Sequence, residues 1–181
     1  MNILTKIRQK LQKSEAFTIA ETLVAVLILL MVSGIVAAGM PAAIHAYQGV
    51  ELASNSELLL STTISELRNE LGVSKNVTVE NTKKAVTYYN ESNNMMSRIY
   101  LKDGKIMCRR NVGSDMSKED EEQPGEPLVT DPLTVKSKLT VTYDSVDLNG
   151  SKDIVKFKNL EVKNGSHVMT SREEVYIRII S

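Results

Sequence analysis

The chain begins with a short polar stretch, continues with a long apolar run, and then changes to alternating apolar and polar positions. No charged residue occurs from Thr22 to Ile44, a run of 23 residues. A helix of that length extends about 35 Å, at about 1.5 Å per residue. The hydrocarbon core of a bilayer is about 30 Å thick. The run therefore predicts a membrane-spanning helix.

The helical pattern continues beyond the apolar run. Apolar residues recur at intervals of three and four, as in an amphipathic helix, at Leu60, Ile64, Leu67 and Leu71. Polar side chains occupy other positions: Ser54, Ser56, Glu57, Ser65, Glu66, Arg68 and Glu70. Pro41 is expected to kink or loosen the helix, and Gly72 to cap it. We predict one helix over residues 18–71, apolar all round in its first half and amphipathic in its second.

After Gly72 the pattern becomes typical of strands. Residues 76–81 and 84–90 are rich in Val, Thr and Tyr, which strands favour. Asp103-Gly104 and Asn149-Gly150 each separate two alternating runs, and such pairs favour hairpins with type I′ turns. With the last run, 173–180, we count six or seven strands. The predicted fold class is α+β, with the long N-terminal helix packed on an antiparallel β-sheet.

The segment 113–127 interrupts the strands. It contains six acidic residues and one lysine, together with proline and glycine. This composition predicts a solvated loop, a weak candidate for ligand binding. A Ca²⁺ site is the alternative, since Ca²⁺ takes about six to eight oxygen ligands. The D-x-D-x-D-G order of a calcium loop is absent, so we expect no metal site.

Composition and motifs argue against several function classes. The 22 basic residues balance the 22 acidic ones, so no overall basic field indicates nucleic-acid binding. No glycine-rich phosphate loop or G-x-S-x-G motif occurs, and His45 and His167 lack metal-ligand spacing. We therefore expect no enzyme and no cofactor.

Cys108 is the one cysteine of the chain, so it forms no intramolecular disulfide. We expect an unpaired strand residue. The alternative is a thiol whose pKa is lowered by its neighbours Arg109 and Arg110.

The first 21 residues leave several interpretations open. Residues 1–16 contain four basic side chains and one acidic one, which favours the cytoplasmic side. Glu21 then stands at the start of the apolar run, where an ionised carboxylate costs several kcal/mol in hydrocarbon. A signal peptide cut within residues 40–46, or a plain anchor, explains the run but not Glu21. An interfacial carboxylate at the positive end of the helix dipole is another interpretation.

Residues 16–30, AFTIAETLVAVLILL, resemble the processing site of type IV pilins and pseudopilins. In this family the mature chain begins with a residue that is usually Phe, followed by Thr and, at the fifth position, Glu. Phe17, Thr18 and Glu21 match this pattern, and a basic leader of 16 residues precedes them. The family strongly prefers glycine before the cut, where this chain has Ala16. The ETLVA sequence looks most like minor pilins and pseudopilins.

The resemblance implies how the chain is processed and organised. Prepilin peptidase would cut between Ala16 and Phe17, and Phe17 would then be N-methylated. Glu21 would pair with the N-terminal amine of a neighbouring subunit in the filament. The implied segments are a cleaved leader 1–16, a transmembrane and filament-core helix 17–43, its amphipathic continuation 44–72, and a β-rich globular domain 73–181.

The resemblance also implies a function, that of a structural subunit in a type IV pilus-like filament for adhesion or motility, secretion, or DNA uptake (competence). Its expected partners are prepilin peptidase, other pilin subunits through the N-terminal helix, the assembly machinery and the lipid bilayer, with no direct indication of nucleic acid. We expect a single-pass membrane protein with a cytoplasmic N-terminus and an extracytoplasmic C-terminal domain, which later enters a cell-surface pilus or pseudopilus. The alternative is a membrane-anchored binding or adhesin module that does not polymerise.

Overall fold

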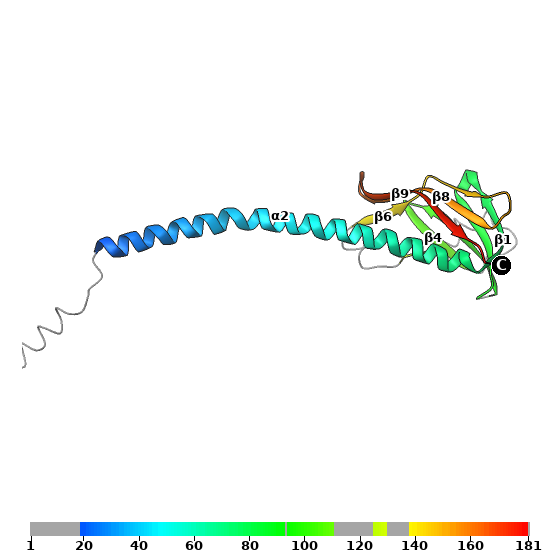
Figure 1. Cartoon of the computed structure of the whole chain (residues 1–181), viewed down its shortest axis with the longest axis horizontal. Coiled ribbons are helices and arrows are strands. Elements are labelled where there is room, and N and C mark those ends of the chain that lie inside the picture. The colour runs from blue at the N-terminus through cyan, green and yellow to red at the C-terminus, as the bar shows by residue number, and fades with distance from the viewer. Residues whose placement is uncertain (1–18, 93, 111–124, 130–137, 181) are drawn as a thin grey trace, which may run out of the picture. The chain divides into compact units, whose positions relative to one another are not determined.

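The structure is a computed structural model, and it describes residues 19–92, 94–110, 125–129 and 138–180 (Figure 1). The chain divides into two units, Met1–Gln48 and Gly49–Ser181. The described part of the first unit is helical throughout. The second unit contains the end of the same helix and two antiparallel sheets.

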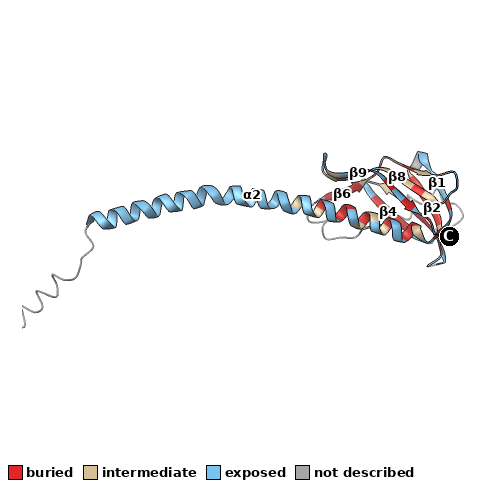
Figure 2. Ribbon diagram, viewed as in Figure 1, coloured by how far each residue is buried: buried red, intermediate tan, exposed pale blue. Residues whose placement is uncertain are grey.

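Helix α2 (Ile19–Gly72) contains 54 residues, begins at the first residue that the structure describes and ends within one residue of the predicted limit. Pro41 lies inside it, and the helix continues on both sides. Every residue from Ile19 to Gln48 is exposed, whereas buried positions alternate with exposed ones in the last part of the helix (Figure 2). The predicted change from an apolar to an amphipathic helix is therefore present.

Sheet A is a meander of consecutive antiparallel strands. Its strands are β1 (Ser74–Glu80), β2 (Ala85–Asn90), β3 (Met95–Lys102), β4 (Lys105–Arg110) and β5 (Glu126–Pro127), with a short 3₁₀ helix, η1 (Asn81–Lys83), between β1 and β2. Asp103 and Gly104 join β3 to β4 and have φ angles of 51° and 70°. Positive φ at both central positions is what a type I′ turn requires, so the predicted hairpin is confirmed.

Sheet B is built around one long central strand. Its strands are β6 (Leu139–Thr142), β7 (Ser145–Leu148), β8 (Ile154–Asn164) and β9 (His167–Arg178). Strand β9 pairs with β8 from Ile154 to Asn164, so β6 and β7 share the other edge of β8. The β8–β9 turn contains Gly165 with a φ of 61°, which suits a two-residue hairpin loop.

Three details of the predicted β region are wrong. The described residues contain nine strands rather than six or seven, partly because the chain breaks at Tyr143 and Asp144 into β6 and β7. Glu126–Pro127 forms a strand at the end of the predicted acidic loop, because it pairs with β4. Asn149-Gly150 is not a two-residue turn, because the connection continues to Asp153 before β8 begins.

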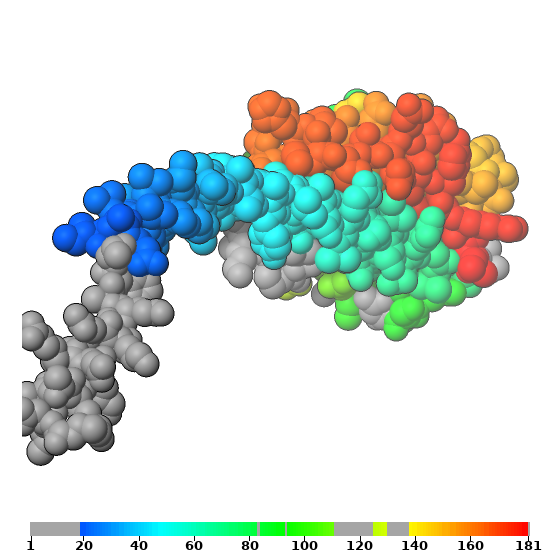
Figure 3. All heavy atoms as spheres, turned by 60° about the vertical axis from the view of Figure 1, so that its left-hand side comes forward, coloured from blue at the N-terminus to red at the C-terminus, as the bar shows by residue number. Residues whose placement is uncertain are grey.

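The apolar core lies between the last part of α2 and both sheets. The helix contributes Leu59, Leu60, Leu67 and Leu71, each at most 1% exposed. Tyr88 and Ile99 of sheet A and Phe157 of sheet B belong to the same cluster. The outer side of this part of α2 stays at the surface, with β9 (orange to red) along one flank (Figure 3). The predicted leucine stripe is thus the face that packs on the sheets.

Candidate functional site

Glu21 lies in the first turn of α2, and its side chain is exposed. The N-terminal turn of a helix favours a carboxylate, because the free N–H groups and the dipole place partial positive charge there. Among the described residues, α2 is the one helix that is long and apolar enough to cross a membrane. The first turn of a potential membrane helix therefore carries the acidic side chain that the family motif requires.

The helix after Glu21 exposes an unusual amount of apolar surface. Its large side chains are each at least half exposed, from Leu23 through Met31 to Ile44. Soluble monomers rarely expose contiguous apolar surface beyond a few hundred Å². Side chains around Pro41, including Val36, Met40 and His45, also border an apolar groove along the helix. Apolar surface of this extent is expected to contact lipid or other protein chains rather than water.

The remaining residues of the processing motif, Ala16, Phe17 and Thr18, lie outside the described residues, as do the rest of the leader and residues 113–124 of the acidic segment. Cleavage before Phe17, its methylation and the pairing of Glu21 therefore stay predictions. So does the solvated state of most of the acidic segment.

Glu70, in the last turn of α2, accepts hydrogen bonds from three side chains of sheet A. Its Oε2 accepts from the Tyr88 hydroxyl and from Nδ2 of Asn90, at 2.9 Å each. Its Oε1 lies 2.6 Å from Nη2 of Arg110. Glu70 is only 8% exposed, although the hydropathy pattern predicts a polar surface position. Burying a carboxylate is costly unless it is paired and hydrogen-bonded, and here all three donors compensate it.

The sequence contains one signal for this burial. Glu70 follows Leu67 by three positions and directly precedes Leu71, so it borders the apolar stripe on the helix surface. Ser56, another residue predicted at the surface, is also buried, and its hydroxyl donates to the Leu52 carbonyl 2.7 Å away. Glu70 is thus buried with partners on sheet A, and Ser56 with a partner one turn earlier on the same helix.

Cys108, in β4, lies beside this cluster, with its Sγ 3.8 Å from the Tyr88 hydroxyl oxygen. Burial raises the pKa of the Cys108 thiol, and the negative charge of Glu70 raises it further. Arg110 acts in the opposite direction but is outweighed, so the alternative of a thiol with a lowered pKa is wrong. A thiol held protonated in this way is a poor nucleophile. The expectation of an unpaired strand cysteine is confirmed.

Tyr88 and Arg110 keep the charge state that the cluster needs. Burial raises the pKa of the Tyr88 hydroxyl, with added contributions from Cys108 and Glu70, so Tyr88 stays a hydrogen-bond donor. The hydrogen bond to Glu70 raises the pKa of Arg110. Both side chains therefore stay protonated and donate hydrogen bonds to Glu70.

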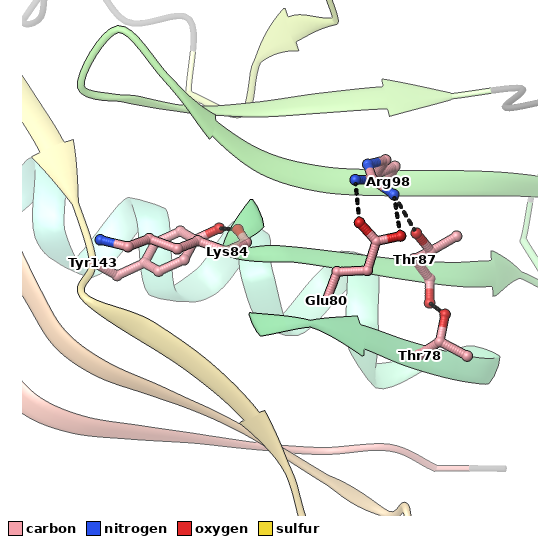
Figure 4. Close-up of polar contacts among 6 residues, drawn as sticks. All are labelled: Thr78, Glu80, Lys84, Thr87, Arg98 and Tyr143. Atoms are coloured by element: carbon pink, nitrogen blue, oxygen red, sulfur yellow. Dashed lines mark hydrogen bonds and ion pairs between the residues drawn. The ribbon is translucent and has the colours of Figure 1, made fainter. Parts of the chain in front are cut away.

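A second polar cluster lies on the other face of sheet A, where Arg98 is fully buried (Figure 4). Its Nη2 lies 3.0 Å from Oε2 of Glu80, and its Nη1 donates to Oγ1 of Thr87 at 3.2 Å. Nearby, the Tyr143 hydroxyl donates to the Lys84 carbonyl at 2.6 Å, which ties sheet B to the β1–β2 connection. These contacts join β1, β2 and β3 to one another and sheet A to sheet B, so we assign them a structural role.

The described residues offer no arrangement of three or more His, Cys, Asp or Glu side chains that would suit a metal ion. His45 lies on α2 and His167 begins β9. No protein-family model matches the chain, and neither the curated proteins nor the solved structures include a significant match. Any functional conclusion therefore depends on the residues and fold of the chain itself.

Proposed function

We propose that the chain is a structural subunit, of the minor pilin or pseudopilin kind, of a type IV pilus-like filament. The observation that carries the proposal is helix α2 itself. It is one continuous helix of 54 residues that carries Glu21 in its first turn, exposes an apolar first half, and packs its last part into a β-sheet domain. The Phe-Thr-x-x-Glu motif around its start supports the same proposal.

The exposed half of α2 would have two roles, first in the membrane and then in the filament. Before assembly its apolar surface is covered by the lipid bilayer, since about 25 cal/mol is gained for each Å² of apolar surface removed from water. In the filament the same surface is covered by the helices of other subunits. Head-to-tail contacts that do not close on themselves generate a filament. One segment thus provides both the anchor and the filament core.

Glu21 would set the position of each subunit relative to the next. Cleavage before Phe17 frees a positively charged amine, and this amine on one subunit pairs with Glu21 of a neighbour. Desolvation offsets much of the energy of an ion pair in a low-dielectric core, so the best-supported role of such a pair is to specify register. A membrane-anchored module that never polymerises would need neither the cleavage nor the carboxylate.

The mass of the mature protein tests this proposal. We expect protein extracted from the membranes of its own cells to begin at N-methylated Phe17, 16 residues after Met1. Intact-mass spectrometry with N-terminal sequencing measures this. As a matched pair, Ala16→Gly should be cleaved at least as completely as the natural chain, because the family prefers glycine there, and Ala16→Arg should stay uncut. Mature protein that retains Met1, or that begins near residue 44, would contradict the proposal.

A further inference from the structure

The end of α2 is attached to the β-sheet domain by directional contacts from three separate parts of the chain. Glu70 accepts hydrogen bonds from β2 and β4. The Gly72 carbonyl accepts from the Ile180 N–H at 2.8 Å, just beyond β9, and the Val73 carbonyl accepts from the Glu91 N–H at 3.3 Å. Polar contacts therefore gather at the last turn of the helix, while Leu59, Leu60 and Leu67 provide apolar packing further back.

Apolar packing alone leaves the register of this helix weakly defined. Hydrophobic attraction has no preferred direction. The stripe of Leu60, Ile64, Leu67 and Leu71 repeats similar side chains about every turn, so a shift of about 5.4 Å would bring a similar residue into each place. Unlike the leucine stripe, the carboxylate of Glu70 makes directional contacts, because its three hydrogen-bond donors lie at fixed positions on two strands. Only one register satisfies all three.

Stability by itself would not require a charge at this position. Replacing a buried ion pair by apolar side chains of similar volume is often neutral or stabilising, and the best-attested role of such groups is to specify one arrangement. We propose that Glu70 is a positioning residue, and that the clasp formed by Glu70, Tyr88, Asn90 and Arg110 fixes the register of α2 on sheet A. This proposal concerns the packing of residues 49–181 and stands whether or not the chain enters filaments.

The single thiol of the chain provides a direct probe of the clasp. Cys108 lies beside Tyr88 and is 4% exposed, so a thiol reagent reaches it only when this region opens. The experiment uses the full chain in detergent micelles and measures the rate at which Cys108 reacts with an aromatic disulfide reagent under native conditions. Hydrogen exchange of the Ile180 and Glu91 amides, which bond to the end of α2, gives an independent measure of opening.

Two variants of α2 form the matched comparison. Glu70→Gln removes the negative charge of Glu70. We expect the exchange of the Ile180 and Glu91 amides to accelerate about tenfold or more, since hydrogen bonds to charged groups contribute about 1.5–3 kcal/mol. The Cys108 reaction should accelerate as well, but the charge of Glu70 also raises the pKa of this thiol, so amide exchange is the deciding measurement. Glu57→Gln makes the same change on the same helix, at an exposed carboxylate that contacts Thr170 of β9. It should leave the exchange rates within about twofold of the natural chain, as expected of an exposed contact. Equal amide-exchange rates in the two variants would overturn the proposal.

A third variant separates register from simple stability. The combined variant Glu70→Leu, Tyr88→Phe and Asn90→Leu replaces the buried acceptor and its two buried donors by apolar groups, while Arg110 is half exposed. We therefore expect cooperative unfolding with a Tm within about 5 °C of the natural value, because apolar packing replaces the buried polar contacts. The Cys108 reaction and the exchange of the Ile180 amide should nevertheless be as fast as in Glu70→Gln and faster than in the natural chain, because the register of α2 is no longer fixed. Cys108 as well protected as in the natural chain would overturn the proposal. If the Glu70 variants fail to fold, Tyr88→Phe provides a milder test, because it removes one donor at nearly constant volume. A Cys108 reaction rate in Tyr88→Phe equal to that of the natural chain would also overturn the proposal.

Discussion

Two glutamates of α2 occupy contrasting environments. Glu70 is buried in the last turn, and its compensating donors, Tyr88, Asn90 and Arg110, belong to the same chain. Glu21 is exposed in the first turn, and the partner proposed for it is an amine on another subunit. We infer that the buried glutamate positions the helix within one molecule and that the exposed one positions molecules relative to each other.

The residues of the clasp show why only part of such a site could be predicted. Its donors lie 18, 20 and 40 positions after Glu70 in the sequence, and no local pattern relates them. The strand pairing that places Tyr88 opposite Ser97 and Ser97 opposite Arg110 assembles the cluster. Features set by neighbouring residues, such as the Asp103-Gly104 turn, were predictable because they need no such long-range information.

Gly125 is a residue that the fold requires to be small. A Cβ atom at this position would lie 2.6 Å from the carbonyl oxygen of Cys108 and 3.0 Å from the Arg109 nitrogen, both backbone atoms. We expect Gly125→Ala to lower the free energy of unfolding by about 1–3 kcal/mol, because β4 must shift to admit the methyl group. Chemical denaturation of the full chain in detergent measures the change.

Gly150→Ala is the matched control, since a Cβ there meets open space. It should change the free energy of unfolding by no more than about 0.5 kcal/mol. A loss of the same size in both variants would show that the close approach at Gly125 is not the cause.

Among the elements, the helix was easier to predict than the strands. Helix α2 follows from one run of local periodicity, and its C-terminal end lies within one residue of expectation. Strand β5 contains only Glu126–Pro127, and its pairing with Met107 and Cys108 outweighs a composition typical of loops. The prediction of a two-residue turn at Asn149-Gly150 was wrong for a different, local reason. The side chain of Asn149 bonds the N–H groups of Asp153 and Ile154, which favours a longer connection.

The two sides of α2 should respond differently to the same substitution. Leu67 is fully buried against the sheets, whereas Leu58 is 52% exposed. We expect Leu67→Ala to cost about 2–5 kcal/mol of stability, from lost burial and the cavity left behind. Leu58→Ala should change stability by about 0.5 kcal/mol or less. Thermal and denaturant unfolding of the two variants measures both values, and equal losses would contradict the packing of this helix face.

At the scale of the whole molecule, the two units differ in how much apolar surface they expose. The described part of Met1–Gln48 is an exposed apolar helix, while Gly49–Ser181 contains the buried core. The charge-free run and the alternating pattern are both local features of the sequence, so the change from an exposed apolar helix to a packed amphipathic one was predictable. Membership of a filament is a property of several chains together. A single chain can indicate it only through a motif such as Phe17, Thr18 and Glu21.

Filament incorporation therefore tests the central claim most directly. Filaments sheared from cells that express the natural chain, Glu21→Ala or Glu51→Ala would be compared with the membrane fraction of the same cells by quantitative immunoblotting. We predict that the natural chain and the Glu51→Ala control enter the sheared filaments. Glu21→Ala should reach the membrane in normal amounts but enter filaments at least about tenfold less, since removing one partner of a buried ion pair costs about 3–5 kcal/mol. Normal incorporation of Glu21→Ala, or a natural chain found only in the membrane, would contradict the claim.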